Sequence, residues 1–288
     1  MTTVDAFTSL ARTLVRQVHP AIRNAFAADS RSPAIKADGS FVTDTDRYVE
    51  ELFTREFEKA LPGVPVIGEE AAAEAYQREV GDARTYYASL MTAPQQVVMD
   101  PIDGTKNFVE GRREFCVAVA LTKRVGEGIW PEAGLVAIPV AGVMYWCSDK
   151  GVFQEDIDGG HVKPIQRFPH PEGRVSVNSK DRGWLREHNF NIQYPWISSG
   201  SSVHDFLGTA LGDLQGSVVS AQRLWDLMAP LAIAERLGCE LRDFTTHERV
   251  TSVTLGDLSG DLVNRPWGFT RRMMLLPQGR PISTLISP

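Results

Sequence analysis

The stretch from Val97 to Gly111, VVMDPIDGTKNFVEG, places two aspartates three residues apart around a Pro-Ile pair. The apolar run before Asp100 predicts a strand that ends at this carboxylate, and Pro101 prevents the ladder from continuing and favours a tight turn. Asp103 then returns close to Asp100, with the Ile102 carbonyl between them. Such an oxygen-rich cluster suits a hard cation such as Mg²⁺.

Gly104 and Thr105 follow where a helix could begin, so their backbone N–H groups could point at an anion such as a phosphate. The competing interpretation is an Asp-Pro turn followed by an Asp-Gly turn between two strands. Further carboxylates favour the metal site, because Glu69 and Glu70 end another apparent strand and Asp226 opens an apparent helix. Like charges gathered in one pocket would raise one another's pKa values unless cations neutralise them.

Two amphipathic helices are expected to support these residues from the N-terminal side. Apolar residues recur at three- and four-residue steps from Val4 to Ala27, which predicts a helix that Pro20 kinks. The segment 43–61, TDTDRYVEELFTREFEKAL, repeats the helical period after a capping threonine. Asp46 should therefore lie near a helix start.

Short apolar runs after the opening motif predict an antiparallel sheet: EFCVAVALTKR, EAGLVAIPV, GVMYWCSD and GVFQE. Residues 1–155 would then form an α+β lobe of two helices on this sheet. The Gly- and Pro-rich stretch DIDGGHVKPIQRFPHPEG predicts a hairpin and a connection. In residues 156–288, strands RVSVNSK, YPWISSG and CELRDF alternate with helices SSVHDFLGTALG and WDLMAPLAIAERLG, which indicates an α/β lobe.

Composition excludes several functional classes. The 288 residues carry 30 basic and 36 acidic side chains, and the net charge of -6 argues against nucleic-acid or anionic-membrane binding. The three cysteines form no CxxC pair, which favours a reducing cytoplasm over a disulfide framework or a zinc site. We find no apolar run long enough for a membrane span and no secretion signal.

Three segments carry a resemblance to a known family. VIGEE, VVMDPIDGTKNFVEG and LWDLMAPLAIAERLG, in this order and spacing, resemble the signatures of the inositol monophosphatase family. KADGSFVTDTDRYVE is similar to that family's N-terminal segment, in which a lysine loop precedes a Thr-x-x-Asp helix start. The resemblance covers nearly the whole chain. It implies a five-layer αβαβα sandwich, two or three Mg²⁺ ions between the lobes, hydrolysis of a small phosphomonoester, and a homodimer.

The resemblance also implies roles for single residues. The metal ligands would be Glu69, Asp100, the Ile102 carbonyl, Asp103 and Asp226. Thr105, hydrogen-bonded to Asp46, would orient or deprotonate the attacking water, with Glu69 as the third catalytic residue, and no phosphoenzyme would form. Gly104 and Thr105 would hold phosphate oxygens, and Gly200 and Ser201 would line the substrate pocket. Lys36 could lie beside the phosphate or be an ordinary loop lysine.

Departures from the family pattern concern the substrate. Inositol-specific members carry a carboxylate seven residues before the aspartate of their Trp-Asp motif, and here that position is Val219. Arg223 could meet a second anionic group of the substrate or lie on the surface. Glu110 adds a negative charge near the site or just outside it. Glu70 is expected outside the set of metal ligands.

The substrate consequently stays open among an inositol phosphate, histidinol phosphate, a sugar bisphosphate and 3'-phosphoadenosine 5'-phosphate. A regulatory or binding protein without turnover is the alternative from another class.

Overall fold

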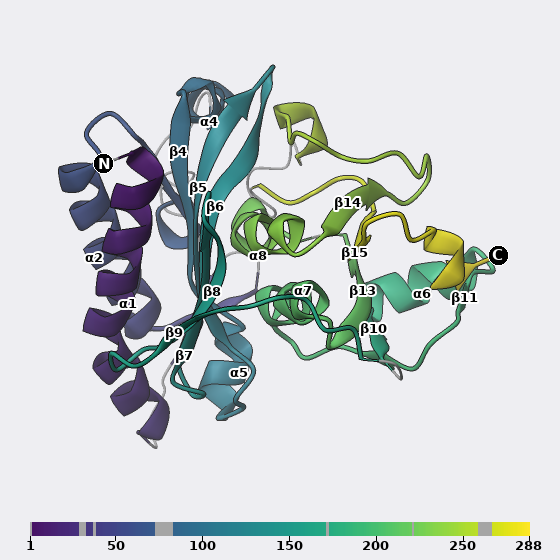
Figure 1. The fold of residues 1–288 in the computed structure, drawn as a ribbon, viewed down its shortest axis with the longest axis horizontal. Coiled ribbons are helices and arrows are strands. Elements are labelled where there is room, and N and C mark those ends of the chain that lie inside the picture. The colour runs from purple at the N-terminus through teal and green to yellow at the C-terminus, as the bar shows by residue number, and fades with distance from the viewer. Residues whose placement is uncertain are drawn as a thin grey trace.

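The computed structural model describes residues 2–28, 33–36, 39–72, 83–170, 173–220, 222–258 and 267–288. Figure 1 shows five successive layers: the helix pair α1 and α2, a first sheet, the helices α7 and α8, a second sheet, and α6 on the far side. The mixed α/β fold and the αβαβα order predicted from the sequence are confirmed. None of the described helices combines the length and the apolar character needed to cross a membrane.

The first layer holds two amphipathic helices, α1 (Thr3–Ala27) and α2 (Asp44–Ala60). Pro20 lies inside α1 without ending it. Their apolar faces pack on each other, with the rings of Phe7 and Phe57 stacked at 5.4 Å between centroids. Thr43 caps α2 through the backbone N–H of Asp46, so the N-terminal end of α2 is fixed where the first sheet carries its acidic residues.

The first sheet has seven strands in the order β3-β4-β5-β6-β7-β8-β9. Its strands are β3 (Val66–Gly68), β4 (Gln95–Asp103), β5 (Cys116–Val125), β6 (Gly128–Ile138), β7 (Val143–Ser148), β8 (Gly151–Asp156) and β9 (Val162–Pro164). Neighbouring strands are antiparallel, as predicted, except that β3 and β4 are parallel. The sheet ends later than the expected lobe boundary at residue 155, because the hairpin after β8 returns the chain as β9.

The expectation that Pro101 ends the strand is wrong, because β4 continues to Asp103. Asp100 pairs with Ala118 and Asp103 with Cys116, so three steps along β4 oppose two steps along β5. This β-bulge explains how the strand tolerates a proline: the residue without an N–H falls where the ladder is interrupted. The bulge also brings the two aspartates to the end of the strand, ahead of the short helix α5 (Thr105–Glu110).

The second sheet has five strands in the order β12-β10-β13-β15-β14. They are β10 (Arg174–Ser176), β12 (Trp196–Ile197), β13 (Leu214–Val219), β14 (Cys239–Asp243) and β15 (Met273–Pro277). The sequence indicated β10, β12 and β14, but β13 and β15 were not anticipated. β10, β12 and β13 run parallel, whereas β15 is antiparallel to both its neighbours.

Helices α7 (Ser202–Leu211) and α8 (Leu224–Arg236) separate the two sheets, and α6 (Ser179–Glu187) covers the outer face of the second sheet (Figure 1). The remaining elements are α4 (Ala83–Thr92), the pair β1 (Ala34–Ile35) and β2 (Phe41–Val42), the pair β11 (Asn191–Ile192) and β16 (Ile286–Ser287), and the 3₁₀ helices Leu255–Asp257 and Ile282–Thr284.

Helix α8 lies directly against β6 at a glycine. A Cβ atom on Gly134 would lie 2.5 Å from the carbonyl oxygen of Ala229 and 3.0 Å from the Cβ of Ala232. These contacts are shorter than van der Waals separations, so only glycine lets the backbones of strand and helix approach this closely. Because α8 also carries Asp226, this contact sets how near that carboxylate comes to the first sheet.

We expect Gly134→Ala to lower the free energy of unfolding by roughly 1–3 kcal/mol, because the added methyl group must displace α8. The matched control is Gly183→Ala in α6, where an added Cβ would meet no heavy atom within 4 Å. The control should be neutral or more stable by up to about 1 kcal/mol, as alanine favours helices. Urea unfolding of both variants measures this, and equal stability of the two would contradict the packing argument.

Candidate metal and phosphate site

Three carboxylates from two layers meet at one end of the first sheet. One oxygen each from Asp100, Asp103 and Asp226 lie within 4.8 Å of one another. Asp100 and Asp103 lie near the C-terminal end of β4, and Asp226 lies in the first turn of α8. Asp100 keeps only 2% of its surface exposed. The site therefore forms where α8 packs on the sheet.

Hydrogen bonds satisfy only part of this cluster. Asp103 Oδ2 accepts from the Ser201 hydroxyl and from the Val203 backbone N–H at 3.0 Å. Asp226 Oδ2 accepts from the Arg223 backbone N–H at 2.9 Å. Asp100 Oδ1 is buried and has no hydrogen-bond partner among the described residues. A buried carboxylate oxygen left unpaired beside two others fits a hard cation as its partner.

Burial and mutual repulsion make this cluster costly to ionise. Burial raises the pKa of Asp226 to about 6. Burial, followed by the charge of Glu69, raises the pKa of Asp100 well above its ordinary value, and burial and Asp226 do the same for Asp103. A divalent cation bound between the carboxylates would reverse these shifts.

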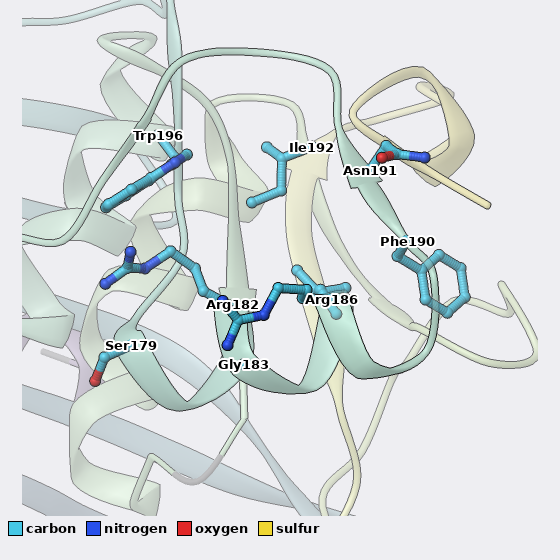
Figure 2. Close-up of a pocket in the computed structure, with 9 residues that line it drawn as sticks. Ser179, Arg182, Gly183, Arg186, Phe190, Asn191, Ile192 and Trp196 are labelled. Atoms are coloured by element: carbon cyan, nitrogen blue, oxygen red, sulfur yellow. The ribbon is translucent and has the colours of Figure 1, made fainter.

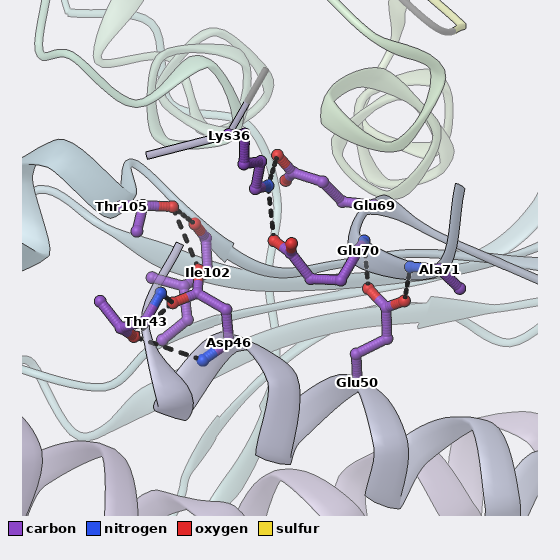
Figure 3. Close-up of polar contacts among 9 residues, drawn as sticks. All are labelled: Lys36, Thr43, Asp46, Glu50, Glu69, Glu70, Ala71, Ile102 and Thr105. Atoms are coloured by element: carbon purple, nitrogen blue, oxygen red, sulfur yellow. Dashed lines mark hydrogen bonds and ion pairs between the residues drawn. The ribbon is translucent and has the colours of Figure 1, made fainter. Parts of the chain in front are cut away.

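Glu69 and Glu70 follow β3 and share one lysine (Figure 3). Lys36 Nζ donates to Glu69 Oε1 at 2.8 Å and to Glu70 Oε1 at 2.6 Å. Burial alone would lower the pKa of Lys36, but the two glutamate charges raise it above its ordinary value. Burial and the Glu69 charge raise the pKa of Glu70 to about 8. Glu69 is thus beside the three-aspartate cluster and ion-paired with Lys36, and its role as a metal ligand stays a prediction.

Glu50, on α2, binds the backbone of the segment that carries Glu69 and Glu70, a contact that was not predicted from the sequence. Its carboxylate accepts from the backbone N–H of Glu70 at 2.8 Å and of Ala71 at 2.6 Å (Figure 3). A Cβ on Gly68 would lie 2.4 Å from the Glu50 carboxyl carbon, so a larger residue there would displace this carboxylate. Burial raises the pKa of Glu50 to about 7. The available signal was its position one helical turn after Asp46 on the same face of α2.

Asp46 and Thr105 form the second polar pair of the site. Thr105 Oγ1 lies 3.1 Å from Asp46 Oδ1 and 3.0 Å from the Ile102 carbonyl oxygen, and its single proton can serve one acceptor at a time (Figure 3). Asp46 Oδ2 accepts from the Thr43 backbone N–H at 2.9 Å and from the Thr43 hydroxyl. Burial raises the pKa of Asp46 to about 6, although the Thr43 hydrogen bonds oppose the shift.

The residues expected to hold phosphate and substrate lie on adjoining turns. Gly104 has φ +86°, and a Cβ there would lie 3.1 Å from the Ser201 side chain, so the start of α5 meets the start of α7. Ser201 caps α7 by accepting from the His204 backbone N–H. The side-chain amide of Asn107 links the segment after α5 to the segment before α7, because it donates to the Glu114 carbonyl at 2.6 Å and to the Ser199 carbonyl at 2.9 Å. The sequence reasoning had not singled out Asn107.

A pocket of about 340 Å³ opens from the cluster toward the second sheet. Gly200, Ser201 and Asp226 line it, as do the cationic side chains Lys180 and Arg223. Arg223 therefore lies in the pocket wall rather than on the open surface. Val219 is fully buried in β13, so position 219 offers no polar group to a ligand. Glu110 is exposed and pairs with Arg112 and Lys106, away from the pocket lining.

Comparison with known proteins identifies this arrangement. The model of the inositol monophosphatase family matches residues 3–269. The chain belongs to the inositol monophosphatase family. Among curated members, it is 31% identical over 237 residues to a histidinol-phosphatase of Streptomyces coelicolor, covering 80% of this chain and 83% of the relative. It is 28% identical over 214 residues to the 3'(2'),5'-bisphosphate nucleotidase CysQ of Salmonella typhimurium, covering 73% and 79% of the two chains.

Solved structures of family members share the fold. An IMPase/NADP phosphatase complexed with Mg²⁺ and phosphate has a TM-score of 0.69 and 15% identity, over 98% of this chain and 94% of that one. The IMPase of Thermotoga maritima has a TM-score of 0.65 and 16% identity, over 93% and 91%. The family predicted from the sequence motifs is thereby confirmed, and the protein is placed among phosphoric monoester hydrolases.

The raised carboxyl pKa values lead to a pH dependence of stability. Burial raises the pKa of Asp46 to about 6 and that of Glu50 to about 7, so the folded state binds more protons than the unfolded state in this range. In EDTA, these two groups should make the free energy of unfolding fall as the pH rises from about 4, near their ordinary pKa values, to about 7, by up to ~1.4 kcal/mol per pH unit for each group.

Urea unfolding at several pH values measures this slope, and Mg²⁺ should reduce it because a cation favours the ionised cluster. Glu50→Gln keeps the side-chain shape and removes one titrating group, so its slope should be smaller than that of the wild type. A stability that rises with pH in EDTA would show that these carboxyl groups are not destabilised by burial.

Proposed function

We propose that the protein hydrolyses a small phosphomonoester in a Mg²⁺-dependent reaction. The observation that carries the proposal is the cluster of Asp100, Asp103 and Asp226, next to the Asp46–Thr105 pair; in it a buried carboxylate oxygen has no partner within the described part of the chain. A protein that kept the fold only as a scaffold would gain nothing from burying these acids together, since their repulsion destabilises it. The regulatory or binding alternative is therefore the weaker one.

The donor set fits Mg²⁺. We assign the ligands as Asp100, Asp103, Asp226, Glu69 and the Ile102 carbonyl, all hard oxygen donors, and we propose two or three ions. Bound Mg²⁺ would supply Lewis-acid activation of water and charge neutralisation at the phosphate. The ion pair from Lys36 to Glu69 balances the charge of Glu69, and we propose that Lys36 also lies beside the bound phosphate.

The chain's own residues then position the nucleophile. We propose that the attacking water donates its proton to Thr105 Oγ1 while the Thr105 proton passes to Asp46, which the 3.1 Å separation permits. The new bond joins the water oxygen to phosphorus, the bond from phosphorus to the leaving oxygen breaks, and the leaving oxygen takes a proton from a solvent water. Gly104 and Thr105 would hold phosphate oxygens through their backbone N–H groups, and Gly200 and Ser201 would border the leaving group.

The substrate classes to be compared are an inositol 1-phosphate, histidinol phosphate, a sugar bisphosphate and 3'-phosphoadenosine 5'-phosphate. Relatives named for histidinol phosphate and for a bisphosphate nucleotide both resemble this chain. Burial of Val219 argues against a polyol bound as in the inositol-specific members, because no carboxylate stands there to accept from ring hydroxyls. We also propose a cytoplasmic homodimer, which sedimentation velocity and cell fractionation test.

Asp100→Asn should lower kcat by on the order of 100-fold or more, because it removes a charged ligand from the cluster. The same change relieves repulsion, so the metal-free variant should unfold at an equal or higher urea concentration than the wild type. Phosphate release at several Mg²⁺ concentrations and urea unfolding in EDTA measure the two effects. Wild-type turnover in the variant would refute the assignment of Asp100.

Thr105→Val should lower kcat by roughly 10²- to 10⁴-fold, since valine keeps the shape of threonine but cannot relay a proton. Thr105→Ser is the matched control, because serine keeps the hydroxyl beside Asp46 and should stay within about tenfold of the wild type. Steady-state phosphate release under saturating Mg²⁺ distinguishes them. Similar losses in both variants would show that the Thr105 methyl group, rather than the hydroxyl, matters.

A further inference from the structure

A second hollow lies between α6 and the segment that follows this helix. Figure 2 shows it between α6, which carries Arg182 and Arg186, and the segment from Phe190 to Trp196 that passes above the helix. Its volume is about 550 Å³, and Ile192 points into the space between the two walls (Figure 2). We call this hollow the α6 groove.

The α6 groove combines an indole face with two guanidinium groups. The Arg182 guanidinium lies 3.7 Å from the centroid of the Trp196 ring. Trp196 is 46% exposed, so part of its aromatic surface is available to a ligand. Arg182 Nε is buried and has no hydrogen-bond partner among the described residues. A planar guanidinium charge beside a partly exposed indole is suited to a planar, anionic ligand.

No acidic side chain among the described residues neutralises these two arginines, since neither forms an ion pair there. Asp181 of the same helix is fully buried and accepts instead from Asn178, Ser220 and Arg272. The charge in the lining of the α6 groove is therefore positive. An anion bound there would gain two cationic partners without displacing an internal ion pair.

The α6 groove and the candidate substrate pocket adjoin at the start of α6, where Ser179 lines both. The candidate substrate pocket, which Asp226 also lines, has the cationic side chains of Lys180 and Arg223 in its wall. It also contains two buried acceptors without partners among the described residues, Asp205 Oδ1 and Gln222 Oε1. Hydroxyl groups of a leaving group would satisfy these oxygens.

We propose that the α6 groove is the subsite for the distal part of a nucleotide leaving group. The aromatic base packs against Trp196, a second phosphate binds Arg182 and Arg186, and the ribose hydroxyls lie over the intervening pocket. The hydrolysed phosphate is at the carboxylate cluster, so this assignment rests on the proposed phosphomonoesterase function. It makes a nucleoside bisphosphate the substrate class, ahead of a polyol phosphate.

The test compares adenosine 3',5'-bisphosphate with glycerol 2-phosphate, which has neither a base nor a second phosphate. Trp196→Ala and Arg182→Met should lower kcat/KM for the bisphosphate by ~10- to 100-fold, mainly through KM, because base stacking and a charged contact are lost. Turnover of glycerol 2-phosphate should change less than about twofold. Trp196→Phe keeps a ring and should recover most of the loss.

Phe168→Ala is the matched control, since Phe168 is 75% exposed and does not line the α6 groove. Equal losses for both substrates, or unchanged bisphosphate turnover in Trp196→Ala, would overturn the proposal. A change in sedimentation coefficient with uniform loss of activity would assign Trp196 to contact with a second copy of the chain instead.

A metal-free binding experiment separates this proposal from the phosphatase function. Calorimetric titration with adenosine 5'-monophosphate in EDTA should give binding that Trp196→Ala weakens by ~10-fold or more. Binding with this dependence would support the α6 groove even if no substrate were hydrolysed. Absence of binding to the wild type would overturn the subsite, whatever the activity toward glycerol 2-phosphate.

Discussion

The repulsion among buried carboxylates at the end of β4 is the constraint around which the site is organised. Burial and the closeness of Asp100, Asp103 and Asp226 raise their pKa values, and the hydrogen bonds from described residues reach only Asp103 and Asp226. Such an arrangement is retained against its cost when a cation completes it. The β-bulge at Pro101 and the close approach of α8 at Gly134 both serve this juxtaposition, because one aligns two of the acids and the other brings the third.

Acidic and basic side chains occupy different parts of the candidate site. The acids lie where β4, α8 and the turn after β3 meet, whereas the walls that extend from them carry Lys36, Lys180, Arg223 and the arginines of the α6 groove. An uncharged polyol would use few of these cations. On the proposed assignment, a substrate with negative charge at both ends would meet cationic side chains along this whole path.

Much of the site was predictable because its acids lie in short local motifs. The spacing of Asp100 and Asp103, and the helix starts at Asp46 and Asp226, follow from turn and capping chemistry that neighbouring residues determine. Contacts between distant segments were not predictable. Glu50 binding the backbone of Glu70, and Asn107 joining two turns, depend on tertiary packing.

In the fold, too, locally determined elements were predictable and those that depend on distant contacts were not. The two N-terminal helices were predicted from their periodicity and β5 to β8 from their short apolar runs. β13 was missed because Gln215, Gly216 and Ser217 interrupt its apolar residues, and β15 is a short apolar run that periodicity alone does not assign to a strand. The continuation of β4 through Pro101 contradicted a sound local rule, since the pairing partner β5 absorbs the proline in a bulge.

Hydrogen bonds to Asp181 fix the position of helix α6 against the second sheet. Fully buried Asp181 accepts from the Asn178 amide at 2.6 Å, from the Ser220 hydroxyl, and from Arg272 Nε at 2.9 Å. These bonds tie the start of α6 to the end of β13 and to the residue just before β15. Because α6 supplies walls to both the pocket and the α6 groove, the hydrogen bonds of this one buried carboxylate help to hold both linings against the second sheet.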